Sequence, residues 1–390
     1  MSTVAITDIG SLVTNDSNVG AGALGLITNA AIVIDSGVVV WVGSKEHLQP
    51  TDVLHSVEGR AVIPGFVDSH AHLMFAGDRA PEFEARMAGQ SYSAGGIRST
   101  VATTRAANDQ ELALNLARLQ AEMLANGITT FETKSGYGLD IETETRSLRL
   151  AASATNEVTY LGAHVVPAEY TNNPDAYVDL VCDQMLAAAV PFAKWIDVFC
   201  ELGAFDADQA RQILTAGKAA GLMPRIHANQ LHSGNGIQVA VDCDAASADH
   251  CTHLTETDIE LLAGSNTVAT LLPGAEFSTR SQYPNARRLL EAGANVALAT
   301  DCNPGSSYTT SMAFCIALAV REMQMTPAEA IWSATAGGAM ALRRSDVGHL
   351  GVGAKADFSV LNAPSYIHLS YRPGVNLIQQ VWQGGQRSIK

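Results

Sequence analysis

The feature of this sequence that most constrains its fold is an alternation of short apolar segments with longer amphipathic ones. Eight segments rich in β-branched residues have the length and composition of buried strands. They span residues 61–68, 128–133, 158–163, 195–200, 222–226, 245–248, 267–272 and 295–300. Between them lie helical patterns such as DQELALNLARLQAEMLANG, which we expect Asp109 to cap and Gly127 to end. This alternation predicts an α/β fold with a (β/α)8 TIM-like barrel, and the alternative is a doubly wound open sheet.

Both ends of the chain read differently from the middle. AAIVIDSGVVVWVGS, residues 30–44, has two β-type runs joined by an Asp-Ser-Gly turn. The segments GVGAKADFSVLNAP and IQQVWQGGQ near the C-terminus return to the same style. The economical interpretation is a discontinuous β domain of residues 1–63 and 346–390, with the barrel inserted as residues 64–345.

The charge balance narrows the choice of partners. The 390 residues carry 24 Lys and Arg against 39 Asp and Glu, a formal net charge of −15. This balance argues against nucleic acid and anionic membrane surfaces, which attract basic patches. The six cysteines form no CxxC pair, and the first residues lack the basic and apolar regions of a secretory signal. We therefore expect a soluble cytoplasmic protein with reduced thiols.

The first barrel segment ends in two histidines one residue apart. In PGFVDSHAHLMF, His70 and His72 follow the apolar run at Phe66 and Val67. Residues i and i+2 of a strand point to the same face, so the two imidazoles are expected side by side. Such a pair suits one metal ion, and the alternative is two satisfied polar side chains at a strand end.

Further strand ends carry residues that can bind a metal. His164, His227 and His250 follow the third, fifth and sixth segments, and Asp301 follows the eighth. In a barrel of this type the carboxyl ends of the strands meet around one site. Several imidazoles and a carboxylate suit a transition metal that keeps an open position for water, which favours a metal-assisted hydrolase over a structural zinc site.

The motif set resembles the amidohydrolase superfamily and, within it, the imidazolonepropionase family. The similarity rests on PGFVDSHAHLMFAGDRAPEF, SGYGL, LGAHVVP, HANQL, SADH and ALATDCNPGSS, which span residues 64–307, and on GHLGVGAKADFSVL. It implies hydrolysis of 4-imidazolone-5-propanoate to N-formimidoyl-L-glutamate in histidine degradation, by attack of metal-bound hydroxide on the ring carbonyl. It also implies a (β/α)8 barrel with a small β-sandwich from both termini, one zinc or iron ion per chain and a cytoplasmic homodimer.

The resemblance also implies a role for each matching residue. The metal ligands would be His70, His72, His227 and Asp301. The catalytic residues would be His250, as general base and acid, and Asp301. The residues implied to bind the small anionic substrate are Arg79, Tyr92, Tyr137, His164, Gln230, Asn303, Gly305 and Ser306.

The residues leave several alternatives open. Arg79 can match a substrate carboxylate with its planar fork, or it can pair with Glu82 or Glu84. Asn303 begins an ordinary turn sequence. Gln230 stands where some base deaminases of the superfamily carry a glutamate, and an amide cannot transfer protons at neutral pH. This weakens, without removing, the alternative of a related hydrolase or deaminase acting on another heterocycle.

Two further alternatives concern the metal. A relative with two metals bridges them through a modified lysine, but the lysine near the fourth strand, Lys194, precedes that strand, so a single ion is favoured. A metal-loaded barrel that only binds a ligand is the alternative from another class of function. A histidine and an aspartate beside an open metal position favour catalysis.

Overall fold

The computed structural model describes residues 3–89 and 96–389 of the chain. These residues fall into two units. The first holds residues up to 68, residues 121–130 and residues from 311 onward, and the second holds residues 69–120 and 131–310. The domain limits expected from the sequence, at residues 63/64 and 345/346, stay a prediction.

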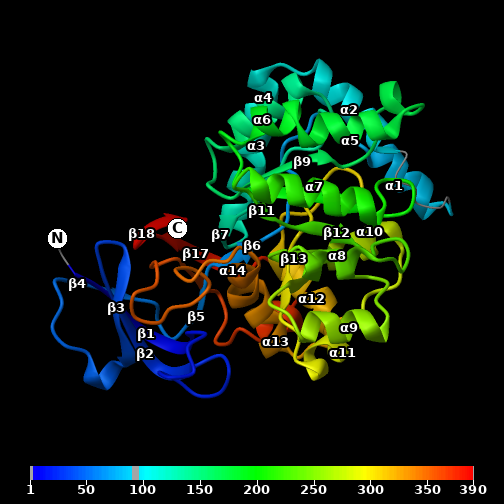
Figure 1. Cartoon of the computed structure of the whole chain (residues 1–390). Helices are drawn as coiled ribbons and strands as arrows, with labels where there is room; N and C mark the ends of the chain where they lie inside the picture. The colour runs from blue at the N-terminus through cyan, green and yellow to red at the C-terminus, as the bar shows by residue number, and fades with distance from the viewer. Residues whose placement is uncertain (1–2, 90–95, 390) are drawn as a thin grey trace. The chain divides into compact units, whose positions relative to one another are not determined.

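Strands from both ends of the chain pair in one eight-stranded sheet of the first unit. The strands are β1 Val4–Val13, β2 Leu26–Asp35, β3 Val38–Ser44, β4 Val53–Ser56, β5 Ala61–Pro64, β16 Phe358–Leu361, β17 Ile378–Gln383 and β18 Gln386–Ile389. The order is β18-β17-β16-β5-β1-β2-β3, with β4 beside β1. In Figure 1 the blue N-terminal strands and the red C-terminal strands belong to this sheet. The expectation that both termini build one β-rich unit is confirmed.

The joint between the two ends of the chain is the antiparallel pair β5–β16. Ile63 lies opposite Ser359, and Val62 opposite Val360. One face of the sheet buries a continuous apolar cluster to which both ends contribute, including Leu12, Ile32 and Phe358. This shared core is what ties the C-terminal strands to the N-terminal ones.

The strands of the alternating region are short, parallel and close to their predicted positions. They are β6 Phe66–Asp68, β7 Ile128–Phe131, β8 Thr133–Lys134, β9 Val158–Ala163, β10 Trp195–Cys200, β11 Met223–Pro224, β12 Ile226–Ala228, β13 Ser247–His250, β14 Val268–Leu271 and β15 Val296–Leu298. The hydrogen-bonded order is β8-β9-β10-β12-β13-β14-β15, with β11 beside β10 and β6 beside β7. Strands β9 and β10 are buried along their whole length, as parallel strands covered on both faces are.

The segment that follows β6 closes the ring of strands in the second unit. Ala71 forms a parallel bridge with Cys302, just beyond β15. The amide of His72 donates to the carbonyl of Cys302 at 2.9 Å, and the amide of Lys134 in β8 donates to the carbonyl of Ala71 at 3.1 Å. Residues 70–72 therefore join the first and last strands of the open order, which confirms the barrel and excludes the open sheet.

Helices alternate with these strands (Figure 1). They are α1 Ala80–Met87, α2 Ile97–Ala106, α3 Asp109–Ala125, α4 Ile141–Ala151, α5 Pro174–Cys182, α6 Gln184–Ala189, α7 Ala207–Ala219, α8 Gly236–Asp242, α9 Glu256–Ala263, α10 Pro273–Thr279 and α11 Ala286–Ala292. The helices after β15 are α12 Met312–Glu322, α13 Pro327–Trp332, α14 Gly338–Ala341 and α15 His368–Tyr371. None of the helices in the described part of the chain combines the length and the apolar character needed to cross a bilayer.

The start of α3 corrects one expectation. Its cap is Asn108, not Asp109, because the Asn108 side chain accepts the amide of Glu111 at 3.0 Å. The Glu111 side chain accepts the amide of Asn108 in return, at 2.9 Å, which completes a capping box. Asp109 instead pairs with Arg149 at 2.5 Å.

The expected end of α3 is confirmed: Gly127 has a φ of +84°, the left-handed conformation that glycine adopts most easily. None of the six cysteines forms a disulfide in the structure.

Candidate active site

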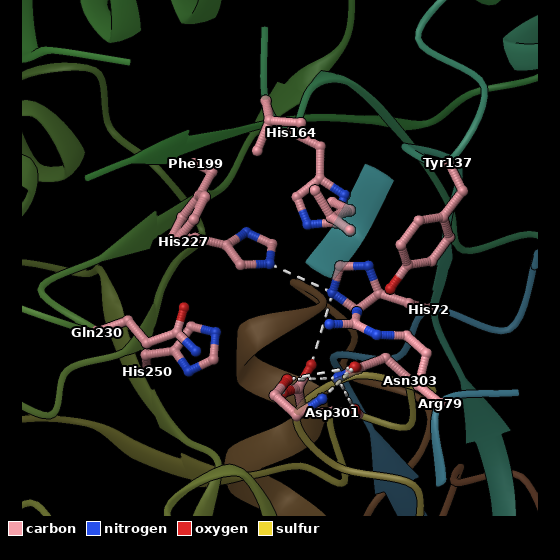
Figure 2. A pocket seen from close by; sticks show the side chains of 13 residues that line it. His72, Arg79, Tyr137, His164, Phe199, His227, Gln230, His250, Asp301 and Asn303 are labelled. Atoms are coloured by element: carbon pink, nitrogen blue, oxygen red, sulfur yellow. Dashed lines mark hydrogen bonds and ion pairs between the residues drawn. The ribbon is translucent and has the colours of Figure 1, made fainter. Parts of the chain in front are cut away.

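The strand-end residues singled out in the sequence converge on one pocket of the second unit (Figure 2). The pocket spans about 450 Å³, a volume that includes space open to solvent. Its lining consists of His72, Arg79, Ile97, Tyr137, His164, Val165, Phe199, His227, Gln230, His250, Asp301, Asn303 and Ser306. His70 lies beside the lining and is fully buried.

Three imidazoles meet at the base of the pocket. The Nε2 atom of His72 lies 3.3 Å from Nε2 of His70 and 3.3 Å from Nε2 of His227. The Oδ1 atom of Asp301 lies 3.5 Å from Nε2 of His70 and 3.5 Å from Nε2 of His72. Ligand atoms of His70, His72 and His227 form one close group, and those of His70, His250 and Asp301 form another.

Two carboxylates fix the orientation of two of these rings. Asp249 accepts from Nδ1 of His70 at 2.7 Å, and Asp197 accepts from Nδ1 of His227 at 3.1 Å. An ionised carboxylate only accepts, so both Nδ1 atoms carry the proton and both Nε2 atoms present a lone pair. His72 lies between two lone pairs and can donate to only one of them. A cation at this point would satisfy both.

A buried cation stands behind each of these carboxylates. Lys134 lies 2.9 Å from Asp197 and 3.0 Å from Glu132, and all three side chains are without exposure. Burial opposes the charged form of Lys134, but the two carboxylates outweigh it and raise the pKa of the ammonium. Arg225, also fully buried, lies 3.5 Å from Asp249 and donates to the carbonyl of Ser69 at 2.5 Å. The ring orientations are therefore set by charges two contacts away from the pocket.

This donor set fits a divalent transition metal. Burial and, after it, the charge of Lys134 lower the pKa of His70, and burial lowers the pKa of His72 and His250 well below the ordinary value. Neutral imidazole is the form that binds a metal. Burial raises the pKa of Asp301, and a cation would hold that carboxylate ionised. Imidazole and carboxylate together suit zinc or iron rather than magnesium or calcium.

The backbone at His250 and Asp301 adopts a conformation that L residues rarely take. His250 has a φ of 78° and Asp301 a φ of 51°, both in the left-handed region. His250 is the last residue of β13, Asp301 lies three residues beyond β15, and the side chains of both line the pocket (Figure 2). Strained residues of this kind cluster at functional sites, where the surrounding structure holds them in place.

The opposite wall of the pocket is an aromatic pair, Tyr137 and His164, whose ring centroids are 5.3 Å apart. Nδ1 of His164 donates to the carbonyl of Gly136 at 2.9 Å, so its Nε2 is an acceptor. Burial lowers the pKa of His164 to about 3, which keeps the ring neutral. The buried carboxylate of Glu144 accepts the amides of Gly138 and Leu139 and thereby ties down the loop that presents Tyr137.

The loop after β15 holds Asp301. The side chain of Asn303 accepts the amides of Gly305 and Ser306, both at 2.8 Å, and so closes the loop on itself. The hydroxyl of Ser306 then donates to Oδ2 of Asp301 at 3.2 Å. The sequence suggested that Asn303 begins an ordinary turn. That turn also forms part of the pocket wall, because it places Ser306 against the carboxylate of Asp301.

Known proteins with similar sequences show the family to which this chain belongs. A model of the amidohydrolase family matches residues 61–387. The chain belongs to the amidohydrolase family. It is 64% identical to a protein named imidazolonepropionase from Streptomyces griseus, with all of both chains covered. It is 63% identical to one of the same name from Streptomyces coelicolor, again with all of both chains covered.

Solved structures support the same amidohydrolase fold. Atrazine chlorohydrolase TrzN from Arthrobacter aurescens TC1, solved in complex with zinc, superposes with a TM-score of 0.73 at 15% sequence identity. The match covers 99% of this chain and 95% of that one. At this level of identity the likeness concerns the fold alone.

Most of the residues predicted from the sequence meet in the amidohydrolase pocket. Tyr92 lies outside the described residues. Gly305 is not part of the lining but lies behind it, where a Cβ atom would come within 2.1 Å of Nη1 of Arg79. Arg79 lines the pocket, and it also makes the alternative contact considered from the sequence, an ion pair with Glu82 at 2.6 Å. No such pair with Glu84 is found in the described part of the chain.

Sequence reasoning missed the charges behind the histidines and the apolar part of the lining. Asp197 carried a usable signal, because it interrupts the otherwise apolar strand WIDVFC. Lys134 and Glu132 offered a weaker signal, as charged residues at the end of a buried strand. Ile97, Val165 and Phe199 offered none, since apolar residues at these places are expected in any barrel core.

Proposed function

We propose that this chain hydrolyses 4-imidazolone-5-propanoate to N-formimidoyl-L-glutamate in the degradation of histidine. The observation that carries the proposal is one pocket that combines the histidine and aspartate cluster with a buried arginine, in a chain 64% identical over its full length to a protein named imidazolonepropionase. The histidine and aspartate cluster would carry out the hydrolysis, and the arginine would pair with the propionate of the substrate.

His70, His72, His227 and Asp301 would hold one zinc or iron ion per chain. The bound ion would supply Lewis acidity and a water whose pKa is lowered toward neutrality. Asp249 and Asp197 already orient the rings of His70 and His227, so little reorganisation of these two residues would accompany metal binding.

The remaining residues would position and protonate the substrate. Arg79 would pair with the propionate, and the neutral His164 would accept a hydrogen bond from the imidazolone ring. Gln230 can donate to and accept from the ring amide, but it cannot transfer a proton. Tyr137, Asn303 and Ser306 would complete the wall on both sides of the ring, with Gly305 next to Arg79 behind it. The family resemblance implies that Tyr92 also contacts the ligand.

The reaction adds one water across a ring C–N bond. The water oxygen bonds to the ring carbonyl carbon, and the bond from that carbon to the ring nitrogen breaks. His250 would take a proton from the attacking water and deliver it to the leaving nitrogen, with Asp301 holding the water in orientation. The product keeps every atom of the substrate and of the water. We place this reaction in the cytoplasm, in a homodimer that binds neither nucleic acid nor membrane.

Turnover of the freshly prepared substrate tests the proposal. The loss of ultraviolet absorbance would be followed on protein of measured metal content, and the product would be identified by its mass. The proposal expects metal-dependent turnover and a product heavier than the substrate by one water. Metal-loaded protein that leaves the substrate intact would show that the substrate is wrong, and cyclic amides and aminated heterocycles would then be compared.

A further inference from the structure

Arg79 and Glu82 form a two-pronged ion pair at the edge of the pocket. Nε of Arg79 donates to Oε1 of Glu82 at 3.0 Å, and Nη2 donates to Oε2 at 2.6 Å. Arg79 caps α1, and Glu82 lies three residues later, in the first turn. Residues at this spacing lie on the same face of a helix, so the start of α1 itself brings the two side chains together.

Backbone from two other segments packs against the pair, of which the Glu82 side chain stays 39% exposed. A Cβ atom at Gly96 would lie 2.1 Å from Nη2 of Arg79 and 2.4 Å from Oε2 of Glu82. A Cβ atom at Gly305 would lie 2.1 Å from Nη1 of Arg79. The guanidinium is therefore packed closely against two glycines, where a larger residue would displace it, and the Arg79 side chain is only 6% exposed.

We propose that Glu82 is a positioning residue that fixes the Arg79 guanidinium and thereby makes the pocket selective for ligands that carry a carboxylate. The inference rests on the proposed function, in which Arg79 pairs with the propionate of the substrate. It adds a residue that lies outside the pocket lining and acts only through Arg79.

The chemistry of arginine supports positioning over competition. A guanidinium has two edges that can each engage a carboxylate, and Glu82 occupies the Nε–Nη2 edge. The Nη1 side lies against Gly305, in the loop that also carries Asn303 and Ser306 of the pocket lining. Glu82 thus engages Arg79 on the edge away from that loop, and an arginine held at one edge loses less side-chain freedom when a ligand arrives.

The close packing of Arg79 against Gly96 and Gly305 also argues against displacement of Glu82 by a ligand. To turn its Nε–Nη2 edge toward the pocket, Arg79 would have to break two charge-assisted hydrogen bonds and give up its close packing against Gly96 and Gly305. A fixed arginine with a permanent carboxylate partner is the arrangement that the packing favours.

Binding of two matched ligands to Glu82→Gln tests the proposal without requiring turnover. Imidazole-4-propionate carries the carboxylate, and imidazole-4-propionamide is its neutral match. Calorimetry on the metal-loaded full chain gives the preference of each variant for the carboxylate. We expect Glu82→Gln to lower that preference about tenfold, which corresponds to the loss of one well-formed contact. Glu84→Gln, a neighbouring exposed glutamate, is expected to keep it.

Turnover then separates positioning from a merely structural role. With the proposed substrate, Glu82→Gln is expected to raise KM about tenfold and to leave kcat within about twofold. In an Arg79→Ala background the same substitution is expected to have no further effect. Glu82→Asp, which keeps the charge but retracts it by one methylene, is expected to lie between the wild type and Glu82→Gln.

Each contrary outcome has a distinct meaning. Tighter carboxylate binding in Glu82→Gln would show that Glu82 competes with the ligand, and it would overturn the proposal. An equal loss for both ligands would also overturn it, because the effect would then not pass through the carboxylate. If the wild type binds both ligands with the expected preference but does not turn over the substrate, the proposed function fails while the positioning role stands.

Discussion

Asp249 accepts a hydrogen bond from Nδ1 of His70 at 2.7 Å, and both side chains are without exposure. The bond fixes which nitrogen of the ring faces the pocket, because the carboxylate can only accept. Asp249 is a strand residue whose neighbour, His250, faces the pocket itself. Two consecutive residues of β13 therefore have different roles: Asp249 supports the proposed metal ligand His70, and His250 is the proposed proton carrier.

Removal of this support should weaken metal binding. We expect Asp249→Ala to lower the affinity for zinc by about 10- to 100-fold, since the ring of His70 loses its orientation and its preferred protonation. Competition with a chromophoric chelator measures the change. Asp208→Ala, at a fully exposed aspartate, is the control and should leave the affinity unchanged. An unchanged affinity in Asp249→Ala would restrict Asp249 to a role in folding.

The buried charge of Lys134 should matter for stability. Lys134→Met would leave the carboxylates of Glu132 and Asp197 buried without their cation, and breaking a buried pair in this way costs about 3–5 kcal/mol. Denaturant unfolding measures the loss. Lys45→Met removes the exposed partner of Asp8 and should cost no more than about 1 kcal/mol. Equal losses in the two variants would contradict the importance given to the buried network.

Glu276 should make the stability of the metal-free protein depend on pH. Burial raises the pKa of this carboxyl from 4.5 to about 7, and the hydroxyl of Thr252 donates to it at 2.7 Å. Between these two values the folded state binds more protons than the unfolded state, so rising pH lowers stability. The carboxyl of Asp301 interacts electrostatically with that of Glu276, so a negative charge on Asp301 would raise the pKa of Glu276 further.

The substitution Glu276→Gln isolates this contribution. As the pH rises from about 5 to about 8, the free energy of unfolding of the variant should increase by up to about 3 kcal/mol relative to that of the wild type. Denaturant unfolding of both proteins across that pH range, with a chelator present, measures the difference between their free energies of unfolding. The chelator is needed because a cation near Asp301 would lower the pKa of Glu276. If that difference stays constant with pH, Glu276 does not titrate in this range.

Gln230 should affect binding of the substrate more than its conversion. An amide cannot exchange protons at neutral pH, so Gln230→Ala loses only a neutral hydrogen bond and should raise KM by up to about tenfold with kcat unchanged. Steady-state kinetics measure both quantities. Gln238→Ala, at an exposed position on α8, should change neither. A large fall in kcat would instead show that the hydrogen bond of Gln230 stabilises the transition state more than the bound substrate.

Local patterns in the sequence predicted the barrel and the residues that converge in its pocket. The two-residue spacing of His70 and His72 and the strand ends at His227 and Asp301 were sufficient, because parallel strands bring their carboxyl ends to one place. The cap of α3 was misplaced by one residue, since Asn108 and Asp109 are both good caps and only the tertiary pairing of Asp109 with Arg149 separates them.

Partners far apart in the chain could not be predicted in the same way. Arg225 and Asp249 look like ordinary polar residues until the fold buries them side by side, and no local period indicates such a pair. The choice of Glu82 over Glu84 as the partner of Arg79 depends on which carboxylate the first turn of α1 places beside it. Both facts belong to packing, which composition and periodicity do not specify.

The measurement that tests the account most directly is the kcat/KM of Arg79→Ala for imidazolonepropionate, compared with wild type on protein of known metal content. The wild type is expected to turn over the substrate with about one metal ion per chain, and the variant is expected to lose at least about 100-fold in kcat/KM because the propionate loses its buried charged partner. Arg321→Ala, at an arginine whose side chain is 81% exposed, should match the wild type. Full activity in Arg79→Ala would contradict the assignment of this pocket to a substrate with a carboxylate.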